Sequence, residues 1–489
     1  MRSLPTSGPI AQPTENRLEE RSMNPETGRK PANSAVSYYL IALVVVVVER
    51  EIGTTPAYLV LLILWAGAVA LRRATLLGGV GLITPFMFYA PILGRLNLAL
   101  IDFILPLLLI AAARVSLGDR RAKKPERVVL TYAVCLVTWI GTSYIGSMLL
   151  GQTADASVGF LIEIAKLVTC LALFWATCVL VERDFRRGVF DLLTGWIAIA
   201  TVTACAVTWD MINTPATLVR STAGFEDPNL LGVFFIASIG VIAIRATFIE
   251  SRALTILQGG LMLLAIVGTS SRGSMLAAAI VFFALPFCIP TRTLVPRLLS
   301  ISAVIGVTAI IYQSRMSIPA LRRLTETEGL ESDIRSDLWA GAVDSWMRNP
   351  VFGIGLGNYS RLSPIYTGNE IPFVAHNTYL SFLAETGLIG ALIFVSILAY
   401  AAWGFLNGWA SAPRSFYVVV SLLALAVNMA TINGQNARFY WVFLGILIAT
   451  LAVRRELGKG RTLTSGNPES YVHRQVRESG TASDWPTAC

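Results

Sequence analysis

Long apolar runs are the feature that most constrains this chain. Segments such as YYLIALVVVVV (38–48) and GALIFVSILAYAAW (390–403) have the composition of membrane spans, which need about 20 mostly apolar residues to cross about 30 Å of hydrocarbon. The 489-residue chain is 54% hydrophobic and 14% charged, whereas soluble domains carry about 25% charged residues. One soluble core of this composition would leave too little polar surface for water, so the sequence predicts a membrane protein.

The apolar runs predict about 12 to 14 transmembrane helices by the same length rule. Lipid offers backbone groups no hydrogen-bond partner, so the spans should be helical, and continuous apolar segments argue against a β-barrel. The predicted fold class is an all-α polytopic membrane protein, with a re-entrant pair as the alternative for 76–115. The predicted spans lie near 35–49, 56–72, 76–94, 97–115, 128–150, 158–181, 187–211, 228–246, 253–270, 273–289, 297–313, 377–404, 414–431 and 436–453.

Basic residues gather in alternate loops. The even-numbered spans are followed by segments such as RVSLGDRRAKKPER and VERDFRR, whereas the loop GQTADASVG has no Lys or Arg. The positive-inside rule then places the basic loops and both termini in the cytoplasm. This pattern explains the net charge of +9 without nucleic acid, which we exclude as a partner. The six cysteines lie singly, without ligand spacing, so no metal site is predicted.

Five segments make up the predicted domain organisation. The loop 314–376 is the only sizeable segment predicted to lie outside the membrane between two spans, and long loops within compact proteins are usually functional. The segments are a disordered cytoplasmic tail (1–34), an N-terminal transmembrane bundle (35–313), a large outer loop with an interfacial helix (314–376), C-terminal transmembrane helices (377–453) and a polar cytoplasmic tail (454–489).

The loops that follow odd-numbered spans are predicted to lie on the outer face, opposite the basic cytoplasmic loops. Arginines and one of only two histidines fall in or next to these outer loops. Arg272, in TSSRGS, lies between two apolar runs; its guanidinium could reach the lipid headgroups or bind a phosphate through two parallel hydrogen bonds. Arg220, in LVRSTAGFEDPN, is either a phosphate ligand or a solvated loop cation. His376 begins the span HNTYLSFLAETGLIG. It is either a structural hydrogen-bonding group or a general base, the usual role of an imidazole in catalysis.

A helix with two tryptophans on one face is predicted in the outer loop. In DIRSDLWAGAVDSWMRNP, Arg335, Trp339, Ala342 and Trp346 follow one another at helical spacing. Tryptophans on one face are typical of a helix in the membrane interface, and this helix should end before Pro350. The glycines of the following FGIGLGNYS predict tight backbone turns, since no strand precedes them as in a dinucleotide site.

Charged residues lie within predicted spans, among them Glu163, Lys166 and Asp102. Glu163 and Lys166 are three residues apart, so they should form an ion pair on one helix face. Asp102 lies just inside the fourth span. Charged groups at membrane depth usually face the protein interior or a wet cavity.

Taken as a set, R…G.FEDPN, TSSRGS, RSDLW…NPVFGIGLGNY and AHNTYLSFLAETGLIG resemble the O-antigen ligase and polymerase superfamily of bacterial membrane glycosyltransferases. The resemblance runs from Arg220 to the final span, and the N-terminal half matches only in hydropathy. It implies a fold like that of C-type glycosyltransferases and an active site at the outer face of the cytoplasmic membrane. It also implies an oligosaccharide donor on undecaprenyl diphosphate, and neither metal nor cofactor.

The resemblance also implies residue roles in an inverting transfer. His376 takes the proton of the acceptor hydroxyl, and Arg220, Arg272 and Arg335 bind the donor diphosphate. The motifs add four supporting residues: Asn229, Asn377, Tyr379 and Glu385. The acceptor is a glycan, lipid A-core or another hydroxyl, so an O-antigen ligase and an exopolysaccharide polymerase are both compatible with the sequence. Membrane lipids and polysaccharide assembly proteins are the other expected partners. A lipid-linked glycan flippase or transporter, or an inactive scaffold, are the alternatives.

Overall fold

A computed structural model describes the chain over residues 31–52, 54–71, 75–84, 90–93, 96–118, 124–151, 157–183, 187–213, 227–246, 252–284, 286, 294–314, 329–368, 371–407 and 415–463. Residues Ser34–Glu456 form one compact unit, to which the following description applies. Of the predicted polar tails, only residues 31–34 and 454–463 are described, and both stretches are helical; Arg220 and part of the long loop lie outside the described residues.

Helices make up nearly all of the described structure, which confirms the predicted all-α class. The exception is an antiparallel hairpin of β1 (Ala90–Leu93) and β2 (Leu96–Leu98). The helices are α2 (Pro31–Ile52), α3 (Thr54–Ala70), α4 (Leu76–Ile83), α5 (Leu100–Gly118), α6 (Lys124–Leu149), α7 (Ser157–Arg183), α8 (Arg187–Asn213), α9 (Pro228–Ala246), α10 (Arg252–Gly268), α11 (Arg272–Ala284), α12 (Leu294–Ser314), α14 (Gly329–Arg348), α15 (Tyr359–Thr367), α16 (Thr378–Asn407), α17 (Ser415–Met429) and α18 (Arg438–Leu463).

The helix lengths agree with a polytopic membrane protein. Within the described residues, six helices are long and apolar enough to cross a membrane, namely α5, α6, α7, α8, α9 and α16. Shorter apolar stretches of 10–17 residues lie in α3, α10, α11, α12, α17 and α18. The membrane class is therefore confirmed, whereas the count of 12 to 14 spans stays a prediction.

The helix predicted over 76–94 is wrong. It ends at Ile83, and the β1–β2 hairpin follows. Glycines in LLGGVGLI and Pro91 make this stretch a poor helix former. The glycines instead let the α4 backbone lie directly against α8, because a Cβ added at Gly81 would lie 2.2 Å from the Leu192 carbonyl oxygen. Close backbone approach through small residues is a common way for membrane helices to associate.

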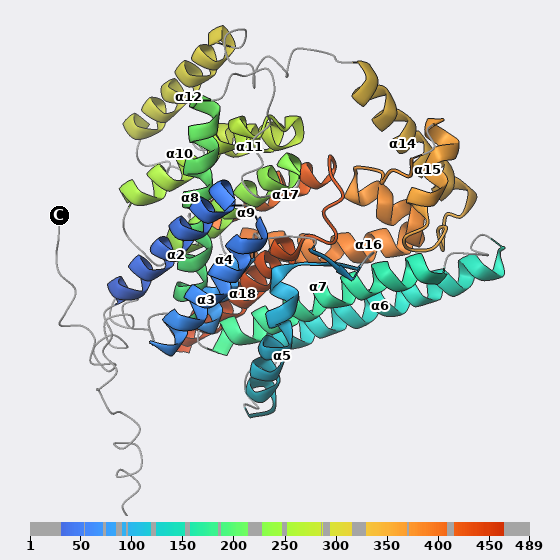
Figure 1. Ribbon diagram of the computed structural model, residues 1–489, viewed down its shortest axis with the longest axis horizontal. Helices are drawn as coiled ribbons and strands as arrows, with labels where there is room; N and C mark the ends of the chain where they lie inside the picture. Colours follow the sequence, from blue (N-terminus) through green and yellow to red (C-terminus); the bar gives the residue numbers. More distant parts are fainter. Residues whose placement is uncertain are drawn as a thin grey trace, which may run out of the picture. The chain divides into compact units, whose positions relative to one another are not determined.

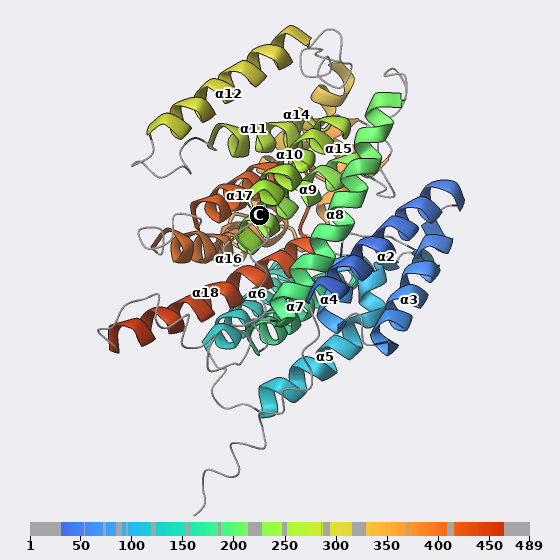
Figure 2. The same ribbon diagram turned by 90° about the vertical axis from the view of Figure 1, so that its left-hand side faces the viewer.

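Helices α16 and α17 each pack against several other helices. Figure 1 shows α6 and α7 side by side, with α16 packed along α6 and with α14 and α15 beside one end of α16. Figure 2 gives the view turned by 90°, in which α17 lies near α9 and α11, both of which it contacts. Buried aromatic rings fill the space between α7, α16 and α18, with the ring centroids of Phe174 and Trp441 6.0 Å apart.

The α16 helix breaks at Gly387 and pairs there with the glycine-rich loop. Gly387 has φ 69° and ψ −176°, a conformation found essentially only at glycine. A Cβ at Gly387 would lie 1.9 Å from the Val351 carbonyl oxygen, so the close approach also requires glycine. The backbone groups freed by the break bond to the loop. The N–H groups of Ile354, Gly355 and Leu388 donate to the carbonyls of Ala384, Glu385 and Pro350, each at 2.9 Å.

The glycine-rich loop turns as the sequence predicts. Gly353, Gly355 and Gly357 all have positive φ, between 69° and 87°. The preceding helix, α14, ends at Arg348, before Pro350 as expected. The loop therefore returns the chain onto α16.

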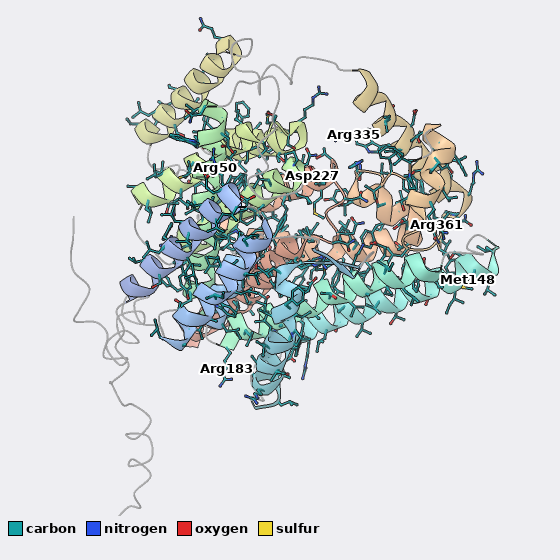
Figure 3. All side chains as sticks on the ribbon, in the orientation of Figure 1. Arg50, Met148, Arg183, Asp227, Arg335 and Arg361 are labelled. Carbon is teal, nitrogen blue, oxygen red and sulfur yellow. The ribbon has the colours of Figure 1, made fainter. Side chains whose placement is uncertain are left out.

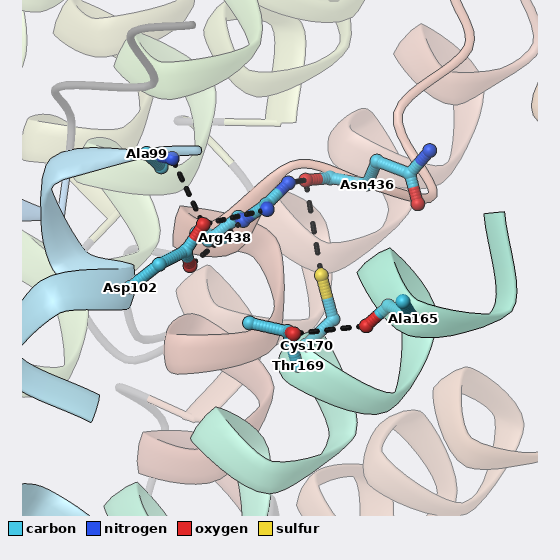
Figure 4. A network of polar contacts seen from close by, with 7 residues as sticks. All are labelled: Ala99, Asp102, Ala165, Thr169, Cys170, Asn436 and Arg438. Atoms are coloured by element: carbon cyan, nitrogen blue, oxygen red, sulfur yellow. Dashed lines mark hydrogen bonds and ion pairs between the residues drawn. The ribbon is translucent and has the colours of Figure 1, made fainter. Parts of the chain in front are cut away.

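A buried ion pair anchors the start of α18 to α5 (Figure 4). Arg438 donates to both carboxylate oxygens of Asp102, at 3.2 and 2.8 Å, and also to the Asn436 carbonyl at 2.9 Å. Asp102 accepts a further bond from the Ala99 N–H at 2.8 Å. Asp102 thus faces the protein interior, as expected of a charge in a span. A buried pair is tolerated when its remaining hydrogen-bonding groups are satisfied in this way.

Replacing Gly387 by alanine should destabilise the protein by more than about 2 kcal/mol, because it adds both backbone strain and a steric clash. Gly368 is the matched control, since it also has positive φ, 65°, but open space around its Cβ position. Gly368→Ala should cost about 1 kcal/mol. Thermal midpoints of the purified variants in detergent measure both effects. Equal midpoints would show that the contact with Val351 does not constrain the break.

Removing one partner of the Arg438–Asp102 pair should be worse than removing both. Arg438→Met leaves the Asp102 carboxylate buried and unpaired, at a cost of about 3–5 kcal/mol. The double variant Arg438→Met, Asp102→Leu leaves no isolated charge, so its thermal midpoint should exceed that of the single variant. Arg348→Met breaks an exposed ion pair with Asp344 and should change the midpoint little. A double variant less stable than Arg438→Met would contradict this account.

Candidate functional site

His376 lies at the entrance to α16 with a left-handed backbone. Its φ is 50°, and the other non-glycine residue with positive φ among the described residues is Ser270, at 52°. A left-handed conformation costs roughly 1–2 kcal/mol in a residue with a side chain. Such strain persists where the surroundings hold it, and it concentrates at functional sites. The second strained residue lies two positions before Arg272, so both flank predicted site residues.

The peptide groups on both sides of His376 are hydrogen-bonded by side chains. The Trp339 indole N–H donates to the Ala375 carbonyl at 3.0 Å. The Asn377 N–H donates to the Asn433 side-chain oxygen at 3.1 Å. Trp339 comes from α14 and Asn433 from the loop between α17 and α18, so two distant parts of the chain fix this backbone.

Three of the predicted supporting residues have structural partners. The Asn377 side-chain oxygen accepts from the N–H groups of Tyr379 and its successor, both at 3.1 Å, and so caps α16. The Tyr379 hydroxyl donates to the Ala426 carbonyl at 2.7 Å. Glu385 is buried, and its carboxylate accepts from the Tyr359 N–H at 3.0 Å. These bonds connect α16 with α17 and α15.

Arg272 is the first residue of α11 and is exposed. The turn before it is held by buried hydroxyl groups: the Ser274 hydroxyl donates to that of Ser271 at 3.0 Å. The side-chain amide of Asn428, in α17, donates to the Ser274 hydroxyl at 3.0 Å. Asn428 is fully buried. A network from α17 therefore fixes the turn that presents Arg272.

Arg335 lies on α14, as labelled in Figure 3, and the predicted helix is confirmed. It is half-buried and lies one turn before Trp339. On the same side, Ala342 is buried and the Trp346 indole donates to the Pro350 carbonyl at 3.2 Å. The location of this helix in the membrane interface stays a prediction.

The loop between α17 and α18, residues 430–437, was not predicted as part of the site. The Thr378 hydroxyl donates to the Ile432 carbonyl at 2.6 Å and accepts from the Gly434 N–H at 2.9 Å. The Ser381 hydroxyl donates to the Asn433 oxygen at 3.0 Å. Four hydrogen bonds, including that from Asn377, therefore join this loop to the first turn of α16.

The same loop also reaches α7 and α11. Asn436 donates to the Glu163 carboxylate at 2.8 Å. The other oxygen of Glu163 pairs with Lys166 at 2.7 Å, which confirms the predicted ion pair. A Cβ added at Gly273, next to Arg272, would lie 1.9 Å from the Thr431 hydroxyl oxygen. The only signal in the sequence is the polar stretch NGQN between two apolar runs.

These contacts bring together the segments that carry three predicted residues. Loop 430–437 contacts both the start of α11, which carries Arg272, and the start of α16, which His376 precedes. The helix that carries Arg335, α14, bonds through another of its side chains to the residue before His376. Asn229, at the start of α9, donates to the Asp227 side chain at 2.9 Å. Arg220 lies outside the described residues. In the described part of the chain, no group of three or more His, Cys, Asp and Glu side chains is placed to hold a metal ion.

Comparison with known proteins finds a family match within this region. Residues 259–395 match a family model described as O-antigen ligase. A search of curated proteins returns no match to the chain. The matched range contains six of the predicted site residues: Arg272, Arg335, His376, Asn377, Tyr379 and Glu385. The predicted resemblance to the O-antigen ligase and polymerase superfamily is therefore confirmed over residues 259–395.

Proposed function

We propose that this protein is a membrane glycosyltransferase that moves a glycan from an undecaprenyl diphosphate-linked donor to an acceptor hydroxyl. The reaction takes place at the outer face of the bacterial cytoplasmic membrane, and both termini lie in the cytoplasm. The acceptor is lipid A-core or another glycan, so the activity is that of an O-antigen ligase or a polysaccharide polymerase. Apolar helices of membrane-spanning length support the location.

The observation that carries the proposal is the O-antigen ligase match over the region that holds Arg272, Arg335 and His376. A shared site is supported by two sets of contacts. The starts of α11 and α16 both contact loop 430–437, and Trp339 of α14 bonds to Ala375, just before α16. A transporter, by contrast, would place its ionisable groups near the bilayer midplane. The charges Asp102, Glu163 and Lys166 within the helices are already paired, so they do not favour that alternative.

In the proposed reaction, His376 accepts the proton of the acceptor hydroxyl as its oxygen attacks the anomeric carbon of the donor. The bond between that carbon and the diphosphate oxygen breaks, and the electron pair leaves with undecaprenyl diphosphate. The sugar configuration inverts because attack and departure occur on opposite faces. Arg220, Arg272 and Arg335 bind the diphosphate. Fixed cations directed at developing negative charge stabilise a transition state strongly in a site with little water. The mechanism uses no metal.

His376→Ala should lower the transfer rate by about 10²–10⁴-fold, the usual contribution of a general base. His473→Ala is the matched control, since it removes the other histidine of the chain and should leave the rate unchanged. The assay uses purified full-length protein with a synthetic undecaprenyl diphosphate oligosaccharide. Lipid A-core and a second lipid-linked oligosaccharide, supplied in parallel, separate ligase from polymerase activity. Wild-type transfer by His376→Ala would overturn the assignment of the base.

Arg272→Lys should reduce transfer by at least about tenfold, because an ammonium cannot donate two parallel hydrogen bonds to a phosphate. Arg348→Lys makes the same change at an exposed arginine of α14 and should have no effect on rate. Initial rates over a range of donor concentrations measure both variants. If the two variants behave alike, Arg272 does not bind the diphosphate through its guanidinium geometry.

A further inference from the structure

His376 is the strained residue whose backbone is held from two sides. Its φ of 50° lies in the left-handed region, where a β-carbon is unfavourable. His376 lies just before α16, which begins at Thr378. A strained backbone conformation persists only where its surroundings hold it in place.

Two side chains meet this requirement. Trp339 donates to the carbonyl that precedes His376, at 3.0 Å, and Asn433 accepts from the N–H that follows it, at 3.1 Å. Ala375 is buried and Asn377 is nearly so, so a peptide group that lost its partner would not be compensated easily by water. We call these two bonds the backbone clamp.

The Asn433 half of the clamp is itself well fixed. The Asn433 oxygen also accepts from the Ser381 hydroxyl at 3.0 Å. Its neighbours Ile432 and Gly434 both bond to the Thr378 hydroxyl. The loop therefore cannot shift along the first turn of α16 without breaking several hydrogen bonds at once.

The Trp339 half comes from the outer-loop helix. α14 is fixed in turn, since the Tyr359 hydroxyl donates to the Leu338 carbonyl next to Trp339 and the Glu385 carboxylate accepts from the Tyr359 N–H. These bonds fix the backbone position from which the Trp339 indole extends. Because φ and ψ of His376 set the direction of its Cα–Cβ bond, fixing both adjoining peptide groups fixes where the imidazole can point.

We propose that Trp339 and Asn433 are positioning residues for His376: through the backbone clamp they hold the imidazole in the direction required for proton abstraction. The expected effect on catalysis rests on the proposed function, in which His376 is the general base. Its structural part, the control of His376 orientation, does not depend on which glycan is transferred.

The test uses four full-length single variants, Trp339→Phe, Asn433→Ala, Asn433→Asp and Trp346→Phe, and the first two are also combined with His376→Ala. Trp339→Phe removes the indole donor and keeps an aromatic ring. Trp346→Phe makes the same change on the same helix and also loses an indole–carbonyl bond, but to Pro350 instead of Ala375. Asn433→Asp keeps an oxygen acceptor that Asn433→Ala lacks. The two pairs therefore isolate the two halves of the clamp.

The first readout is the rate at which diethylpyrocarbonate modifies His376, measured by mass spectrometry at fixed pH with His473 of the same chain as the internal reference. Trp339→Phe and Asn433→Ala should each change this ratio by about fivefold, the factor that corresponds to loss of one hydrogen bond of about 1 kcal/mol. Trp346→Phe and Asn433→Asp should keep the parent ratio. An unchanged ratio in both Trp339→Phe and Asn433→Ala overturns the proposal.

The second readout is glycan transfer. Trp339→Phe and Asn433→Ala should lower kcat about tenfold with donor KM little changed, and neither should lower the residual rate of His376→Ala further, because they act through the imidazole. A further fall in that background overturns the positioning role. Wild-type transfer by His376→Ala itself would contradict the proposed function instead, while the modification ratios would still report on the clamp.

Discussion

Backbone hydrogen bonding at the helix breaks is the constraint on which the rest of this structure depends. Lipid cannot satisfy an N–H or C=O group, so a break at membrane depth is tolerated only where the protein supplies the partners. In α16 the break at Gly387 is matched by the loop that contains Gly353, Gly355 and Gly357. Between α17 and α18, the loop 430–437 is matched by the first turn of α16. Each irregular segment thus supplies hydrogen-bond partners to another part of the chain.

The hydrogen-bond partners at the break in α16 come from distant parts of the sequence. The Trp139 indole on α6 donates to the Thr386 carbonyl at 2.9 Å, next to the break. The Ser143 hydroxyl, one turn further along α6, donates to the Phe352 carbonyl in the glycine-rich loop. A membrane helix from the first half of the chain therefore supports the break from behind. Because the break and the glycine-rich loop share this support, the two are held against each other around Gly387.

Local sequence patterns predicted the features that depend on neighbours along the chain. Helical spacing predicted α14 and the Glu163–Lys166 pair, and the glycine spacing predicted the turns after Pro350. Partners far apart in sequence were not predictable in this way. Asp102 was recognised as an interior charge, but Arg438 lies 336 positions away, just after the polar stretch NGQN, and no periodic signal connects the two. The helix predicted over 76–94 failed because apolar content alone does not reveal the glycine packing of α4 on α8.

The motif that begins at His376 therefore contains residues of different physical kinds. Asn377 caps the helix, Thr378 bonds to loop 430–437, and Glu385 bonds to the start of α15. Each of these side chains satisfies backbone groups that lipid or a buried interior would leave unpaired. Replacing any of them would disturb the geometry at His376, so loss of activity alone would not show that a motif residue touches the substrate. A readout of His376 itself is needed to separate residues that act on the substrate from residues that hold the backbone in place.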